Sequence, residues 1–404
     1  MHRIQRSRHA LACALALVGC AHLPESFDSQ RQRAVAAPAS AAVASAPSAP
    51  VPAGASAEPA PSTPAAPPTP ESFADLFERM RSGFTLPEIA NASVEREIAW
   101  YQGRPAYVER SFGRGRRYLH YIVETLEARD MPRELALLPV VESAFDPFAF
   151  SRARASGLWQ FIPSTGRLYG LGQDGWSDDR RDVLQATSAA LDHLQDLHAE
   201  FAGDWLLALA AYNAGSARVS RAIERNVRQG RPTDFFALDL PAETRAYVPK
   251  LLAISRLVAE PESFGLDLPE IPNAPYFARV DVRKPVDLRK VADLASIPRD
   301  ELRALNPAFN RWATAPDGRR HLLVPATERA RLEQVLASIP AYEEPRVVQR
   351  RVKRGDTLAS IARRHKITVA DLRAANRLRG SLIRPGQILR IPVRAAEGDR
   401  RSPA

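Results

Sequence analysis

Apolar residues recur at helical spacing through residues 114–260, and this pattern limits the possible folds more than any other feature of the chain. In one segment they stand at i, i+1, i+4, i+5 and i+8, as Tyr118, Leu119, Ile122, Val123 and Leu126. The run from 205 to 211 is apolar on every side, as in a buried central helix, and Gly215 is suited to end it. Further helical stripes start at Leu184 and Tyr247. We find no convincing strand pattern here and predict an all-α domain.

One carboxylate stands out within this helical region. Glu142 follows the apolar residues Leu137, Leu138, Val140 and Val141, and Asp146-Pro147 comes shortly after it as a turn signal. A carboxyl group at the edge of an apolar patch resists ionisation and can stay protonated near neutral pH, as a general acid must. The alternative is a solvated glutamate at a helix end, which is the usual situation for an isolated Glu.

The last third of the chain contains an internal repeat with an offset of 70 residues. Eight pairs match: Val282 and Val352, Leu288 and Leu358, Ala292 and Ala362, Ile297 and Ile367, Leu302 and Leu372, Arg303 and Arg373, Ala304 and Ala374, Asn306 and Asn376. The later copy predicts a strand from 347 to 352, helices after Asp356-Thr357 and after Thr368, and a strand from 387 to 393. We therefore expect two small α+β modules of βααβ order.

The first twenty residues resemble a bacterial lipoprotein signal. Arg3, Arg6 and Arg8 precede a short apolar core, 11–18, which is too short to span a bilayer, and Leu17-Val18-Gly19-Cys20 matches a lipobox. The resemblance implies that Cys20 is acylated after removal of residues 1–19; the alternative is an ordinary secretory signal with an incidental cysteine. Cys13 would leave with the leader, so the mature chain would have no disulfide.

Residues 34–70 consist almost entirely of alanine, proline, serine and valine. Such a segment has no apolar face whose burial could offset the entropy of ordering it. We predict that residues 20–70 are a lipid-anchored, disordered tether. Where its proline-rich part is extended, at about 3 Å per residue, it would reach on the order of 100 Å.

Charge and histidine spacing narrow the functional classes. The net charge of +10 favours an anionic partner, such as a cell-wall polymer, a membrane surface or nucleic acid. No basic recognition helix and no aromatic-rich basic strand stands out, so we do not expect a nucleic-acid-binding protein. His193 and His198 are five residues apart, a spacing that does not place them on one helical face, and we predict surface histidines and no metal site.

Four motifs follow one another in the helical region: Glu142-Ser143, Gly157-Leu158-Trp159-Gln160-Phe161, Ala211-Tyr212-Asn213-Ala214-Gly215 and Tyr247-Val248-Pro249-Lys250. In this order they resemble the motifs of the goose-lysozyme-like soluble lytic transglycosylases, glycoside hydrolase family 23, and more closely the membrane-bound lytic murein transglycosylase D type. The resemblance covers residues 135 to 252. It implies a lysozyme-like catalytic domain that needs no cofactor.

The resemblance also implies a mechanism with one carboxylate. Glu142 would protonate the oxygen between MurNAc and GlcNAc and then, as a carboxylate, take the proton of the MurNAc C6 hydroxyl group. That hydroxyl attacks C1 of its own sugar and gives a 1,6-anhydro end. No second acid stands in a recognisable partner motif, and Asp146 beside Pro147 suits a turn.

The remaining motif residues are assigned to substrate binding by the same resemblance. Amide and hydroxyl side chains suit a neutral sugar. Gln160 and Asn213 would bind sugar or N-acetyl groups, Tyr212 and Tyr247 would line the site, and Ser143 and Ser151 would make further hydrogen bonds. For Tyr212 and Asn213 the alternative is a simple helix end, since Asn near Gly is common there.

The later repeat resembles a LysM module, which binds N-acetylglucosamine-containing chains such as peptidoglycan. The resemblance rests on Gly355-Asp356-Thr357-Leu358, Ile361-Ala362, Asn376 and Arg384-Pro385-Gly386-Gln387. The earlier copy has Pro285-Val286 in place of Gly355-Asp356, a departure in the ligand loop, so we expect a degenerate LysM-like domain that could be only a spacer. The alternative for both copies is a small α+β interaction module that binds some other partner. The predicted organisation is a leader 1–19, a tether 20–70, a helical lead-in 71–113, a catalytic domain 114–268, a LysM-like domain 269–340, a LysM domain 341–396 and a disordered tail 397–404.

Three functions are compatible with these features. The first is a lytic transglycosylase in the bacterial cell envelope, anchored through Cys20 and facing the periplasm. Ala21 after the cysteine favours the outer membrane by resemblance. The second is a muramidase of the same fold that hydrolyses with water, and the third is a non-catalytic scaffold that binds peptidoglycan through LysM.

Overall fold

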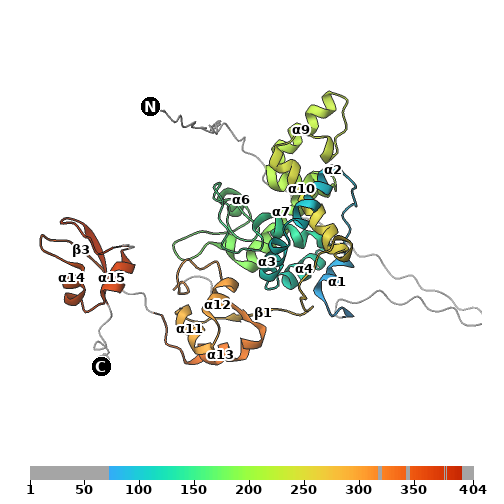
Figure 1. Ribbon diagram of the computed structural model, residues 1–404. Helices are drawn as coiled ribbons and strands as arrows, with labels where there is room; N and C mark the ends of the chain where they lie inside the picture. The colour runs from blue at the N-terminus through green and yellow to red at the C-terminus, as the bar shows by residue number, and fades with distance from the viewer. Residues whose placement is uncertain (1–71, 317–320, 343–345, 377, 379, 394–404) are drawn as a thin grey trace, which may run out of the picture. The chain divides into compact units, whose positions relative to one another are not determined.

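The computed structural model describes residues 72–316, 321–342, 346–376, 378 and 380–393 (Figure 1). The predicted leader, Cys20, the tether up to residue 70 and the tail 397–404 lie outside the described residues. No helix in the described part is long and apolar enough to cross a membrane. The helices of the first domain are α1 Leu76–Arg81, α2 Ala92–Gln102, α3 Pro105–Gly115, α4 Leu119–Glu127, α5 Leu138–Ser143, α6 Pro163–Leu168, α7 Val183–Glu200, α8 Trp205–Ala214, α9 Ser216–Arg228 and α10 Ala242–Ala259, with short 3-10 turns η2 Arg133–Leu137, η3 Asp179–Arg181, η4 Phe235–Ala237 and η5 Glu262–Phe264.

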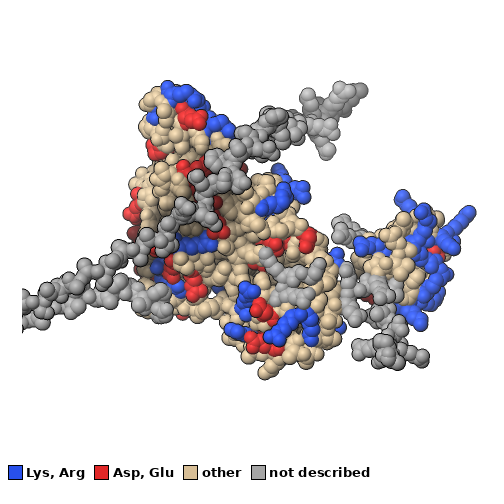
Figure 2. All heavy atoms as spheres, turned by 180° about the vertical axis from the view of Figure 1, so that it is seen from behind, with Lys and Arg blue, Asp and Glu red and all other residues tan. Residues whose placement is uncertain are grey.

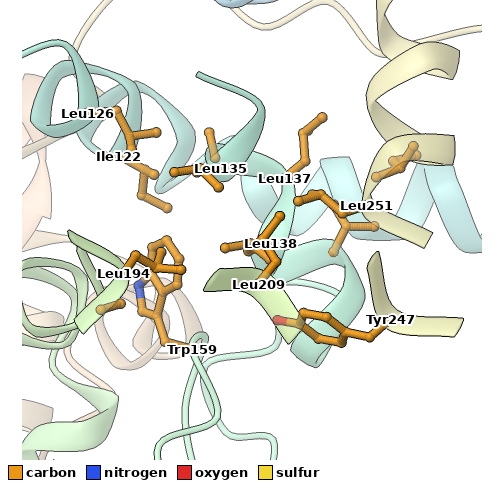
Figure 3. Packing of buried hydrophobic residues seen from close by; sticks show 14 of the residues in the cluster. Ile122, Leu126, Leu135, Leu137, Leu138, Trp159, Leu194, Leu209, Tyr247 and Leu251 are labelled. Carbon is orange, nitrogen blue, oxygen red and sulfur yellow. The ribbon is translucent and has the colours of Figure 1, made fainter. Parts of the chain in front are cut away.

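The helix α8 lies at the centre of this domain and packs against α7, α9 and α10. Its residues 207–211 are buried, which explains why the sequence is apolar on every side of this helix. Asp204 caps α8, because its side chain accepts two amide hydrogens of the first turn. Figure 3 shows leucines of several segments around the ring of Trp159, whose Nε1 donates to Thr187 Oγ1 at 3.1 Å. The core therefore holds the segment around Trp159 in place.

The first three helices belong to the same core. Leu76 and Phe77 of α1 are buried, and the ring of Phe77 meets that of Phe112 in α3 edge to face, with centroids 5.1 Å apart. The described part of segment 71–113 is therefore integral to the helical domain. Residues 114–268 contain helices and isolated bridges and no extended strand, which confirms the predicted all-α class.

Two small modules follow, each built on a two-stranded antiparallel sheet. In the first, β1 Phe277–Asp281 pairs with β2 His321–Pro325, and α11 Leu288–Ala295 and α12 Arg299–Leu305 lie between them in sequence. In the second, β3 Arg346–Arg351 pairs with β4 Ile388–Val393, with α14 Leu358–Arg364 and α15 Val369–Ala375 between them. The predicted βααβ order is confirmed in both. The first module adds η6 Ala326–Glu328 and α13 Arg329–Ser338 after its second strand.

The asparagine shared by the two repeats joins the second helix of each module to the second strand. Asn306 donates to the carbonyl groups of Leu302 and Leu323 at 2.8 and 2.6 Å and accepts the amide hydrogen of Leu323 at 2.9 Å. Asn376 does the same with Leu372 and Arg390, at 2.8, 2.7 and 2.7 Å. In each module two of these bonds pair both backbone groups of one strand residue, and the third reaches a carbonyl group of the preceding helix. The repeated Asn is thus explained by folding.

The two modules differ at the loop before their first helix. In the second module Gly355 has φ of 88°, and Asp356 accepts the amide hydrogen of Lys353 at 2.8 Å. In the first module the corresponding loop pairs with a later segment, since Val286 N donates to Thr314 Oγ1 at 2.9 Å and Thr314 N donates to Val286 O at 3.1 Å. This loop of the first module is therefore covered by its own chain.

The first module is also bound to the helical domain. Arg117 forms a two-pronged ion pair with Glu301, with Nη2 2.7 Å from Oε2. Tyr118 donates its hydroxyl hydrogen to the carbonyl group of Ala304 at 2.8 Å, and Asp178 N donates to Ala308 O at 2.9 Å. These contacts join α12 and its neighbouring loop to the helical domain.

We expect Asn306→Ala to destabilise the first module by about 2–4 kcal/mol, because it leaves the buried amide and carbonyl groups of Leu323 without their side-chain partner. Asn376→Ala should cost less, since Asn376 is only half-buried. Hydrogen exchange measured by mass spectrometry should show loss of protection in β2 for the first variant. Gln334→Ala, at an exposed position of α13, is the control; equal exchange in both variants would contradict this role of Asn306.

Candidate active site

Glu142 is the penultimate residue of the short helix α5. The helix ends at Ala144, which is left-handed with φ of 50°, and Phe145 follows with φ of 54° and a fully buried side chain. This turn depends on Gly115 in α3, since a Cβ at that position would lie 2.8 Å from Cδ2 of Phe145. The burial of Phe145 thus fixes where the helix carrying Glu142 ends.

A cleft of about 1520 Å³ opens beside Glu142. It is lined by segments from α5 to α10, so residues distant in sequence meet along one groove. Six of the seven predicted catalytic and binding residues line it: Glu142, Ser151, Gln160, Tyr212, Asn213 and Tyr247. Ser143 does not, because its hydroxyl group is directed to the protein, with Leu158 O at 2.9 Å and Pro139 O at 3.2 Å. Ser143 therefore ties α5 to the turn that carries Gln160.

The pKa of Glu142 is raised to about 7. Burial is the main cause, because it disfavours the charged carboxylate. A hydrogen bond from Tyr247 acts in the opposite direction, with Tyr247 Oη 2.6 Å from Glu142 Oε1, and the charge of Glu243 raises the pKa further. Near neutral pH this carboxyl group can therefore both give and take a proton.

Two tyrosines stand at the cleft with fixed hydroxyl groups. Tyr247, on α10, donates to Glu142, whereas Tyr212, on α8, donates to Trp159 O at 2.9 Å. Burial raises the pKa of both phenols well above the ordinary value, so both stay neutral and can act as donors. Tyr212 thus donates its hydroxyl hydrogen to the backbone carbonyl group next to Gln160, and Tyr247 donates its own to the Glu142 carboxyl group.

Gln160 lies in a tight turn with φ of 48°. Its Nε2 donates to Gly157 O at 2.8 Å and to Ala149 O at 3.2 Å, which leaves Oε1 as an acceptor. Gly157 is required at this turn, because it has φ of 84° and a Cβ there would lie 2.2 Å from Arg180 O. The turn therefore offers the cleft an amide oxygen that cannot easily rotate away.

Ser151 and Asn213 each use one side of their polar group within the protein. Ser151 Oγ accepts the amide hydrogen of Ala155 at 3.1 Å, so its hydroxyl hydrogen is available to a ligand. Asn213 Oδ1 accepts from Thr244 Oγ1 at 2.8 Å, which links α8 to α10 and leaves the Nδ2 group as a donor. Asn213 therefore does more than end a helix.

The cleft lining also contains three titratable residues that the sequence did not indicate as site residues: His193, Glu243 and Lys250. Glu243 and Lys250 lie one turn before and after Tyr247 on α10, and this spacing could have suggested them. The prediction that His193 is a surface residue is wrong, since its ring is half-buried between Tyr169 and Tyr212. His198 instead stacks on Trp205, with centroids 3.9 Å apart.

Asp146 has the turn role that the sequence suggested, because its Oδ1 accepts the amide hydrogen of Phe148 at 2.9 Å. Within the described parts of the chain, no group of three or more His, Cys, Asp and Glu side chains could hold a metal ion.

Comparisons with known proteins match three parts of the chain. Family models match the transglycosylase SLT domain at residues 121–234, the LysM-like domain of lytic transglycosylase MltD at 276–341 and the LysM domain at 351–392. Membrane-bound lytic murein transglycosylase D of Escherichia coli (strain K12) is 41% identical over 316 residues, which are 76% of this chain and 70% of that protein. The peptidoglycan transglycosylase gp16 of Escherichia phage T7 is 34% identical over 31% of this chain and 9% of its own length.

Among solved structures, an inactive mutant of lytic transglycosylase Slt from Pseudomonas aeruginosa aligns with 25% identity over 37% of this chain and 25% of that chain, with a TM-score of 0.27. The family is shown by the sequence relatives and the family models.

The raised pKa of Glu142 has a consequence for stability. Glu142 in the folded state, with a pKa of about 7, binds the proton more tightly than in the unfolded chain, where the ordinary pKa of 4.5 applies. The resulting stabilisation is complete below pH 4.5 and is lost as the pH rises through 7. Relative to wild type, we expect Glu142→Gln to gain on the order of 2 kcal/mol between pH 5 and 8, a figure discounted for partial exposure. Thermal unfolding at both pH values measures this, and a difference independent of pH would contradict it.

Proposed function

Since the chain belongs to the family of the membrane-bound lytic murein transglycosylases D, we propose that it cleaves the bond between MurNAc and GlcNAc in peptidoglycan and closes the MurNAc end as a 1,6-anhydro ring. The observation that carries the proposal is the state of Glu142. It is a carboxyl group with a pKa near 7, in a long cleft, hydrogen-bonded to a neutral tyrosine.

In the first step Glu142, protonated, gives its proton to the glycosidic oxygen, and the bond from that oxygen to C1 of MurNAc breaks. GlcNAc leaves with a 4-hydroxyl group, and the N-acetyl group of MurNAc stabilises the positive C1. In the second step the Glu142 carboxylate takes the proton of the C6 hydroxyl group, whose oxygen bonds to C1. Glu142 ends the cycle protonated, so no proton is gained or lost.

The surroundings of Glu142 support a mechanism with one carboxylate. Glycosidases that hydrolyse generally place a second carboxylate across the scissile bond. Among the described residues of the cleft lining, the other carboxylate is Glu243, whose side chain is exposed at the start of α10. A muramidase would need Glu243 or another group to activate water, which makes Glu243 the residue that separates the two candidate functions.

The remaining site residues would hold the sugars. Gln160 offers an acceptor, Asn213 offers donors, and Ser151 offers a hydroxyl hydrogen, which together suit N-acetyl and hydroxyl groups. Tyr247 would hold Glu142 in place and stabilise its carboxylate between the two steps. We assign Ser143 to positioning of α5 and not to direct sugar binding.

The C-terminal module would hold the enzyme on its substrate. The chain binds peptidoglycan through an SLT and a LysM domain, and we propose that the loop at Gly355 and Asp356 is the glycan-binding loop. Figure 2 shows lysine and arginine side chains gathered on this module, where they suit the carboxylates of peptide stems. In the first module the corresponding loop is covered, so we propose that this module is a docked spacer.

We further propose that the chain is a lipoprotein of the outer membrane facing the periplasm. The lipobox ending at Cys20 and the alanine- and proline-rich segment support this proposal, as does the membrane-bound relative in E. coli. A lipid anchor with a long tether would let the catalytic domain reach glycan strands at a distance from the membrane.

We expect Glu142→Gln to reduce the release of anhydro products from purified peptidoglycan by at least about 1,000-fold, because it removes the only proposed proton donor. Glu243→Gln is the matched control and should keep activity within about threefold of wild type. Mass spectrometry of the product ends measures both. Reducing ends in place of anhydro ends, together with loss of activity in Glu243→Gln, would favour the muramidase; no cleavage by wild type would favour the scaffold.

We expect Cys20→Ser to move the protein from the membrane fraction to the soluble periplasmic fraction, because it removes the thiol that the lipid would modify. Fractionation with detection by antibody measures this, and mass spectrometry of the N-terminal peptide should find a diacylglyceryl cysteine only in wild type. A Cys20→Ser protein that stays with the outer membrane would exclude the proposed anchor, once binding to peptidoglycan is removed by digestion of the wall.

A further inference from the structure

His193 is a cleft residue for which the proposed mechanism has no use. It lies on α7, and its ring is packed between Tyr169, at a centroid distance of 4.8 Å, and Tyr212, at 5.3 Å. Tyr212 lines the cleft beside it, whereas Tyr169 lies behind and is not part of the lining. His193 has no hydrogen bond to Glu142, so a direct part in proton transfer is not indicated.

A chain of hydrogen bonds fixes the tautomer of His193. Asp196 Oδ2 lies 2.9 Å from the hydroxyl oxygen of Tyr169, and a carboxylate can only accept, so Tyr169 must donate its one hydrogen to Asp196. His193 Nδ1 lies 2.9 Å from the same oxygen. Since Tyr169 has no second hydrogen, His193 Nδ1 must carry the proton and donate it. Nε2 is then the nitrogen with the lone pair.

Two observations make Nε2 available to a ligand. Within the described protein, the His193 side chain makes one hydrogen bond, from Nδ1 to Tyr169. Nε2 has no partner among the described residues and is not fully buried, and His193 lines the cleft, so Nε2 is open to the cleft. Burial also lowers the pKa of His193, and the nearby charge of Asp196 opposes this without reversing it. At neutral pH the ring is therefore uncharged, and Nε2 is an acceptor.

We propose that His193 Nε2 accepts a hydrogen bond from a sugar hydroxyl or an N-acetyl N–H group of the glycan strand, and that His193 is a specificity-determining residue of this cleft. This inference rests on the proposed function. A neutral acceptor beside an aromatic wall suits uncharged sugar donors. Gln160 Oε1 offers an acceptor elsewhere along the same cleft. His193 and Gln160 would therefore accept hydrogen bonds from donors at separate positions of the glycan strand.

Kinetics on soluble glycan strands test the role of the nitrogen. His193→Phe keeps a ring between Tyr169 and Tyr212 but has no acceptor, and we expect its KM to rise about threefold to tenfold with kcat nearly unchanged. His193→Gln can place an amide oxygen near the position of Nε2 and should recover part of the loss. Tyr169→Phe removes the hydrogen bond that fixes the tautomer of His193 but leaves the cleft lining unchanged, and it should raise KM by a smaller factor than His193→Phe. A wild-type KM in His193→Phe overturns the proposal.

Imidazole ¹⁵N NMR tests the same point without turnover. In the free protein the His193 signal, identified by its absence in His193→Gln, should show protonated Nδ1 and unprotonated Nε2, and chitotetraose should shift Nε2. An Nε2-protonated ring, or no shift at saturating chitotetraose, overturns the inference. If His193→Phe and His193→Gln show the same loss of thermal stability and the same rise in KM, the role of His193 is structural and the inference is wrong. If wild type forms no anhydro ends, the proposed function fails, while the NMR result still decides the role of His193.

Discussion

The hydrogen bond from Tyr247 to Glu142 is the interaction on which the electrostatic state of the cleft depends. It joins α5 to α10 across the cleft at 2.6 Å, and it opposes the effect of burial on the acid, so that the pKa of Glu142 settles at about 7. Neither partner sits on a flexible loop. Figure 3 shows Leu138 and Leu251 packed in the same core as the ring of Tyr247. A rigid apolar core thus sets an electrostatic balance. A small separation of the two helices would remove the donor, and burial and the charge of Glu243 would then raise the pKa of the carboxyl group without opposition.

The polar residues around the cleft divide by how they use their hydrogen bonds. Ser143 and Tyr212 give their hydroxyl hydrogens to backbone carbonyl groups and so hold the turn between Gly157 and Gln160 against α5 and α8. Gln160, Asn213 and Ser151 are each anchored through one side of the polar group and keep the other side for a ligand. A side chain anchored in this way loses little entropy when a sugar binds. The same residue types in the same motifs therefore have distinct tasks, which only the pattern of partners reveals.

Much of this could be predicted from the sequence. Helical periodicity gave the all-α domain, an acid at the end of an apolar run indicated Glu142, and the offset repeat gave two βααβ modules. Comparison with known proteins confirmed the family. Local patterns could not reveal contacts between distant segments. The spacing of His193 and His198 predicts surface histidines, but the place of His193 in the cleft depends on its contacts with Tyr169 and Tyr212, which local spacing does not indicate. Likewise, Pro285-Val286 showed that the first module differs from LysM, but the pairing of Val286 with Thr314 needed the fold.

The bonds of Asn306 and Asn376 separate two kinds of constraint within one small module. Both residues close the unit in the same way, although only the second module keeps an uncovered loop before its first helix. The first module has instead gained the contact between Glu301 and Arg117 of the helical domain. The shared asparagine bonds therefore show what the backbone of both modules requires, whereas the loop before the first helix differs between them. The same module fold can therefore either present a loop to a ligand or dock against a neighbouring domain, without a change in its backbone fold.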